Sequence, residues 1–75
     1  MNIEHLVTMA NDIGNFFVSE AGDDAAPREI ATHITKFWDP RMRTAIIGHG
    51  KAGGEGLSPA SKAAVALLVP PPPRD

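Results

Sequence analysis

The chain has 75 residues with a net charge of −2 and no cysteine. This length allows one small domain, and the lack of cysteine excludes disulfides, iron–sulfur ligation, thiolate zinc sites and cysteine nucleophiles. Because a core of this size leaves little net stability after conformational entropy is subtracted, we expect a partner subunit to supply further support.

The strongest periodic segment covers about residues 2–20. Apolar side chains recur there at spacings of three and four, which predicts a helix with one apolar face formed by Ile3, Leu6, Val7, Ala10, Ile13 and Phe17. Asn2 is a suitable N-cap for this helix. Gly14 costs about 1 kcal/mol relative to alanine, so its presence in the pattern indicates the close approach of a neighbouring backbone. Met9 and Phe16 widen the apolar surface beyond what a few small helices can cover, which indicates a partner.

A first break in the chain follows this segment. Gly22 is expected to end the first helix, and Asp23 or Asp24 to cap a second helix that runs from about Ala25 to Trp38. The second helix should bury one apolar stripe, which consists of Ile30, Ile34, Phe37 and Trp38.

A second break lies at Asp39. Its carboxylate can accept a hydrogen bond from the free N–H groups of the next helix, and Pro40 fits the first turn because that position donates no hydrogen bond. The residue before a proline also disfavours the α region, which places the break at Asp39. We therefore expect a third helix from Pro40 to about Ile47, ended by Gly48.

Trp38 lies at the corner between the second and third helices, and basic side chains surround it in the sequence. Residues 27–62 carry six lysines and arginines against three acidic residues, whereas residues 1–26 carry five acidic residues and no lysine or arginine. This asymmetry favours a basic face that meets an acidic protein surface, with an ordinary solvated face as the alternative. Because tryptophan and arginine dominate binding hot spots, we predict partner-binding residues around this corner: Phe16, Phe37, Trp38, Arg41, Met42 and Arg43.

The last third of the chain is rich in glycine and then in proline. Five glycines fall within residues 48–56, which is typical of a flexible linker. Ser58 and Pro59 are suited to start a short apolar helix, and the prolines at 70–73 must leave it as an extended tail. The expected organisation is an all-α fold with a three-helix core at 1–47, a linker at 48–56, a short C-terminal helix at 57–69 and a proline-rich tail at 70–75.

No group of residues indicates an active site. Gly48, Gly50 and Gly53 match the G-x-G-x-x-G pattern, but this pattern binds dinucleotides only after a strand in a βαβ unit, and here it follows an expected helix. The three histidines lie on different elements without further ligands at metal spacing, and no serine lies beside a base and an orienting group. We therefore expect no catalytic, cofactor-binding or metal-binding residue in this chain.

Membranes and nucleic acids are not expected as partners. No apolar run reaches the length of a membrane span, and the N-terminus lacks a signal-peptide pattern. The net negative charge argues against nucleic-acid binding. A small helix-turn-helix module is nevertheless kept as the alternative function, because the second and third helices meet at a basic corner.

Four blocks of the sequence resemble one family, the delta subunit of soluble NAD-dependent formate dehydrogenases. They are Leu6–Phe17, His33–Ile34, Lys36–Arg43 and Gly56–Pro59. Their order and spacing extend the resemblance over about residues 5–60, and the proline tail lies outside it.

The resemblance implies a non-catalytic cytoplasmic subunit that binds the catalytic alpha subunit and supports its assembly, cofactor maturation or stability. It also implies where the cofactors of such a complex reside. The alpha subunit would carry a molybdenum or tungsten bis-guanine-dinucleotide cofactor and iron–sulfur clusters, and the beta and gamma subunits FMN, the NAD site and further clusters. The family contributes no catalytic residues to this chain.

Overall fold

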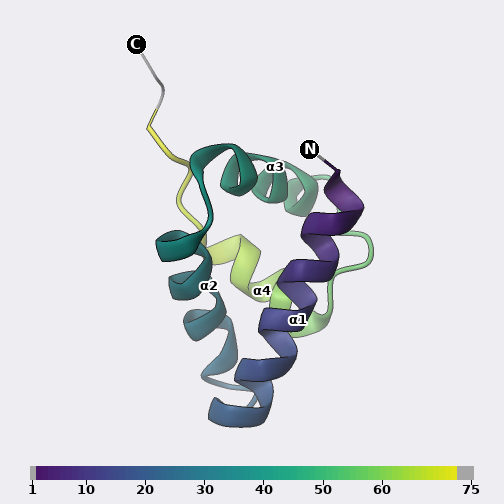
Figure 1. Ribbon diagram of the computed structural model, residues 1–75. Helices are drawn as coiled ribbons and strands as arrows, with labels where there is room; N and C mark the ends of the chain where they lie inside the picture. The colour runs from purple at the N-terminus through teal and green to yellow at the C-terminus, as the bar shows by residue number, and fades with distance from the viewer. Residues whose placement is uncertain (1, 73–75) are drawn as a thin grey trace.

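Four α-helices make up the part of the chain that the computed structural model describes, residues 2–72 (Figure 1). They are α1 (Ile3–Ala21), α2 (Ala26–Phe37), α3 (Pro40–Lys51) and α4 (Pro59–Leu67). Helices α1 and α2 run antiparallel, α3 crosses one end of this pair, and the short α4 packs against all three. The expected all-α class is confirmed.

The N-cap residues predicted from the sequence are observed for three of the four helices. The side chains of Asn2, Asp39 and Ser58 each accept a hydrogen bond from a backbone N–H in the first turn, at 2.9, 3.0 and 3.3 Å. These three predicted N-caps are confirmed. The prediction for α2 is wrong, because its N-cap is Ala25, which offers no side-chain acceptor.

Helix α3 is longer than the sequence suggested. It continues through Gly48 and Gly50 to Lys51, so the expected end at Ile47 is wrong. The reason lies in packing against α4, since a Cβ atom on Gly50 would lie 2.6 Å from Cγ1 of Val65. Tertiary contact here outweighs the low helix propensity of glycine.

The segment between α3 and α4 is a series of hydrogen-bonded turns. Backbone bonds join Gly54 N to His49 O at 2.9 Å and Leu57 N to Gly54 O at 3.0 Å. Asn11 of α1 ties the end of this segment down, because its amide donates to Gly56 O and accepts from Ser58 N, each at 2.9 Å. These bonds fix where α4 begins relative to α1.

All four helices contribute to a single core. Its buried apolar residues are Leu6, Ala10, Ala26, Ile30, Ala31, Ile34, Trp38, Ile46, Ile47, Ala64, Val65 and Leu68. Trp38, expected in the buried stripe of the second helix, is 5% exposed, whereas its neighbour Phe37 is 71% exposed. The expectation that Phe37 belongs to the buried stripe is therefore wrong: α2 ends at this residue, and the side chain extends beyond the core.

Helix α4 approaches α1 closely at Gly14. The Ser61 hydroxyl donates a hydrogen bond to Ala10 O at 3.0 Å and accepts one from the Ser58 hydroxyl at 3.0 Å. A Cβ atom on Gly14 would lie 2.5 Å from this buried Ser61 oxygen. The close approach predicted at Gly14 is present, but the expectation that a neighbouring backbone makes it is wrong, because the nearest atom is the side-chain oxygen of Ser61 on α4.

The contact at Gly14 can be tested with matched glycine substitutions. Gly14→Ala should lower the free energy of unfolding by about 1–3 kcal/mol, because the new methyl group displaces α4. Gly48→Ala is the control, since nothing lies within 4 Å of its Cβ position, and it should raise stability by about 0.5–1 kcal/mol. Urea denaturation followed by circular dichroism measures both.

The Ser61→Ala background identifies the clashing atom. Removing the hydroxyl should reduce the cost of Gly14→Ala and give a coupling energy of about 0.5–3 kcal/mol in the double-mutant cycle. Additive effects would show that Ser61 does not limit this contact.

Adjacent aromatic residues with opposite burial provide a second test. Trp38→Ala should cost about 3–5 kcal/mol of unfolding free energy, because it leaves a large cavity in the core. Phe37→Ala should change it by no more than about 0.5 kcal/mol, because the ring is already exposed. Equal losses for the two variants in chemical denaturation would contradict the burial described above.

Candidate partner-binding surface

Four ring side chains form a continuous strip across α1 and α2, here called the aromatic surface: Phe16, Phe17, His33 and Phe37. Ring centroids lie 5.1 Å apart between Phe16 and Phe17, 6.0 Å between Phe17 and His33, and 4.7 Å between His33 and Phe37. The first two pairs meet edge to face, the arrangement that the quadrupole of an aromatic ring favours. The strip therefore joins side chains of two helices into one ordered patch.

The two ends of the aromatic surface are open to solvent. Phe16 is 58% exposed and Phe37 is 71% exposed, whereas Phe17 and His33 are partly buried between them. Burying a phenylalanine side chain completely is worth about 1.5–3 kcal/mol. The chain by itself does not obtain much of this stabilisation at the two ends of the same surface, which is typical of a surface that contacts a partner.

A shallow hollow lies at the α1 end of the aromatic surface. It has a volume of about 300 Å³ and is lined by Asp12, Ile13, Phe16, Phe17 and His33. Although Asp12 is among these residues, the surface of the hollow is almost entirely apolar.

The six predicted partner-binding residues occupy different environments. Phe16, Phe37 and Arg41 are exposed, Met42 is partly buried against the core, and Trp38 lies within the core. Trp38 therefore supports the surface by holding the α2–α3 corner. Direct contact of any of the six with a partner stays a prediction.

Arg43 has a structural role at the same corner. Its Nη1 donates to Trp38 O at 2.6 Å and makes a longer contact of 3.5 Å with Thr35 O. These carbonyls belong to the end of α2, where a positive charge is also favoured by the helix dipole. Arg43, which was predicted to contact a partner, thus interacts with carbonyl groups of its own chain.

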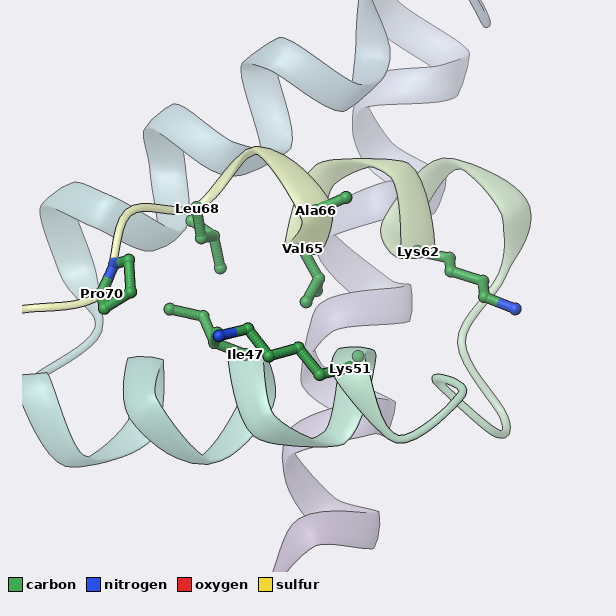
Figure 2. Close-up of a pocket in the computed structure, with 8 residues that line it drawn as sticks. Ile47, Lys51, Lys62, Val65, Ala66, Leu68 and Pro70 are labelled. Atoms are coloured by element: carbon green, nitrogen blue, oxygen red, sulfur yellow. The ribbon is translucent and has the colours of Figure 1, made fainter.

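A second hollow lies between α3 and α4, and two lysines are among its lining residues (Figure 2). Its volume is about 410 Å³, and it is lined by Ile47, Gly50, Lys51, Lys62, Val65, Ala66, Leu68 and Pro70. Lys51 lies across this groove toward Ile47, and Lys62 points away from it. No carboxylate occurs among the lining residues described.

Sequence reasoning did not link Phe17 and His33 to the partner-binding residues. His33 and Phe37 are four residues apart and therefore neighbours on one helix face, which was the available signal. The pairing with Phe17 depends on how α1 packs on α2, which spacing within either helix does not specify.

The histidines and acidic residues form no metal site within residues 2–72. His33 packs between Phe17 and Phe37, and Nε2 of His49 lies 2.7 Å from Glu55 O in the turn after α3. In the same range, none of the helices has the length and apolar character needed to cross a bilayer.

These features define a small helical protein whose most distinctive surface is a strip of partly exposed rings. A family model described as NADH-dependent formate dehydrogenase delta subunit, FdsD, matches residues 5–65. The chain therefore belongs to the formate dehydrogenase delta subunit family, as the sequence blocks predicted. Comparisons with curated proteins and with solved structures give no match.

The two arginines at the start of α3 should differ in their effect on folding. Arg43→Ala should lower the free energy of unfolding by about 1 kcal/mol, because hydrogen bonds to two carbonyls are lost at a partly solvated site. Arg41→Ala should leave it unchanged, since this side chain is exposed. Thermal denaturation of the two variants compares them directly, and equal melting temperatures would contradict the structural role of Arg43.

Proposed function

We propose that this chain is a non-catalytic subunit that binds the catalytic alpha subunit of an NAD-dependent formate dehydrogenase. In this role it supports the assembly, cofactor maturation or stability of the alpha subunit in the cytoplasm. The observation that carries the proposal is the aromatic surface, whose exposed ends Phe16 and Phe37 leave apolar area uncovered. Membership of the delta subunit family supports the proposal that the partner belongs to a formate dehydrogenase complex.

The proposal places the cofactors of the complex in other subunits. The molybdenum or tungsten bis-guanine-dinucleotide cofactor and iron–sulfur clusters belong to the alpha subunit, and FMN, NAD and further clusters to the beta and gamma subunits. The residues of this chain do not fit these groups. There is no cysteine to ligate iron, and the Gly48–Gly53 pattern lies in and after α3 rather than between a strand and a helix.

The size of the aromatic surface indicates how much more contact is needed. Covering the exposed parts of two phenylalanine rings contributes about 2–4 kcal/mol, whereas association costs about 4–15 kcal/mol in lost translational and rotational freedom. The aromatic surface can therefore anchor the complex but cannot hold it alone. Met9 and Ile13, partly buried on α1, and the exposed Arg41 extend the available contact area.

The anchor role can be tested by pull-down of the full chain with the alpha subunit. Phe16→Ser and Phe37→Ser should each weaken binding about tenfold, corresponding to about 1.4 kcal/mol, because each removes an apolar ring from the interface. Both positions are exposed, so the variants should keep the circular dichroism spectrum of the parent chain.

Leu67→Ser is the matched control, because Leu67 is 56% exposed on α4, outside the aromatic surface. It should bind the alpha subunit as the parent chain does. Undiminished recovery of the alpha subunit with the Phe16→Ser, Phe37→Ser double variant would refute the proposal.

A further inference from the structure

The groove between α3 and α4 shares no residue with the aromatic surface. We propose that it receives an apolar side chain from an acidic segment of a partner protein, and that a carboxylate of the same segment pairs with Lys51. This inference rests on the proposed function in one respect, because the partner is taken to be a subunit of the same formate dehydrogenase complex.

The groove is built by the packing of α3 on α4. Each helix contributes three lining residues at spacings of three and four, so each set lies on one helix face: Ile47, Gly50 and Lys51 from α3, and Lys62, Val65 and Ala66 from α4. Leu68 and Pro70 add apolar surface from the extended segment after α4. The two helices can approach here because a Cβ atom on Gly50 would lie 2.6 Å from Cγ1 of Val65.

Two of the three lysines of the chain line this groove, although the net charge of the chain is −2. Lys51 extends across the groove toward Ile47, whereas Lys62 points away from it (Figure 2). The direction of Lys62 has a structural cause, because its stem packs against the turn before α4, with Cε 3.3 Å from the position of a Cβ atom on Gly54. Of the two lysines, Lys51 is thus the one that offers its positive charge to an occupant.

The groove favours an occupant that has both an apolar and an anionic part. Its surface is mostly apolar, so an apolar side chain that enters it gains the free energy of releasing water. An uncharged occupant would also remove water from the Lys51 ammonium and leave it unpaired, which is costly. A neighbouring carboxylate removes this cost, since it pairs with the ammonium while the aliphatic stem of Lys51 covers the apolar group.

The size of the groove and the needs of the proposed complex favour a protein segment as the occupant. A volume of about 410 Å³ lies in the lower part of the range of about 300–1,000 Å³ that is typical of ligand pockets, which suits a side chain. The aromatic surface alone does not offset the cost of association. A second contact on the same chain adds binding free energy, whereas the translational and rotational freedom is lost only once.

Two exposed alanines of α4 test whether the groove is occupied. Ala66 lines the groove, and Ala63, three residues before it, is not among the lining residues. Ala66→Phe places a ring in the groove and should weaken binding of the full chain to the formate dehydrogenase complex prepared without it by about tenfold. Ala63→Phe adds the same ring outside the groove and should bind as the parent chain does. Circular dichroism melting checks that both variants fold.

The two lysines test the anionic part of the occupant in the same assay. Lys51→Glu should weaken binding by about tenfold, because it places a like charge opposite the partner carboxylate, and Lys51→Arg should retain binding. Lys51→Gln should reduce the dependence of binding on salt concentration. Lys62→Glu changes the net charge equally on a side chain that points away, and should weaken binding much less. Equal effects of Lys51→Glu and Lys62→Glu would overturn the pairing with Lys51.

A synthetic peptide tests the chemistry of the occupant without the complex. In an NMR titration of the full chain, a capped peptide of alternating glutamate and leucine should shift the amide signals of residues 47–51 and 62–68 most. The same peptide with lysine in place of glutamate should not shift them. Equal shifts with both peptides, or none with the acidic one, would overturn the proposal. Shifts with decanoate but not with the acidic peptide would also overturn it, in favour of a lipid-like anion.

The outcomes separate this inference from the proposed function. If the Phe16→Ser, Phe37→Ser double variant loses the complex while Ala66→Phe and Lys51→Glu bind as the parent chain does, the groove is overturned and the proposed function stands. If the double variant binds normally while Ala66→Phe and Lys51→Glu lose the complex, docking through the aromatic surface is overturned and the groove stands. Leu67 does not line the groove, so Leu67→Ser is a control for both surfaces.

Discussion

The structure depends on how closely α4 can approach α1 and α3. At Gly14 the Ser61 hydroxyl takes the space of a missing methyl group and bonds to the carbonyl of Ala10, and at Gly50 the side chain of Val65 does the same without a hydrogen bond. A helix of nine residues is too short to persist alone in water, so these contacts maintain it. Because the chain has no cysteine and therefore no disulfide, the packing of α4 against the other helices is what completes the core.

This compact core changes where the large side chains lie. Aliphatic and small residues suffice to fill the space between the helices, together with Trp38. The three phenylalanines are therefore not needed inside: Phe17 is partly buried, and Phe16 and Phe37 are exposed. The aromatic surface thus exists because the small core is filled without these rings. It leaves an apolar area that a larger protein can cover.

The sequence predicted most of what depends on local chemistry. Helical periodicity and the N-caps at Asn2, Asp39 and Ser58 are properties of one helix or one turn, and they were predicted. Gly14 also indicated a tight contact, but not that Ser61 of α4 makes it. The longer α3 could not be foreseen, because it depends on Gly50 meeting Val65 from a distant segment. The aromatic surface was foreseen only in part for the same reason: the sequence pointed to Phe16 and Phe37 as candidate partner-binding residues, but their link through Phe17 and His33 exists only once α1 packs on α2.

Asn11 is hydrogen-bonded to Gly56 and Ser58, which lie 45 and 47 residues further along the chain. Contacts of such long range form only after the intervening helices have come together, since closing the loop costs entropy that local turns cannot offset. Detaching α4 would expose both the surface of α1 around Gly14 and the side of α2 that α4 covers. The molecule should therefore unfold as one cooperative unit. Amide hydrogens in α1 and α4 should then exchange slowly and with the same free energy of opening.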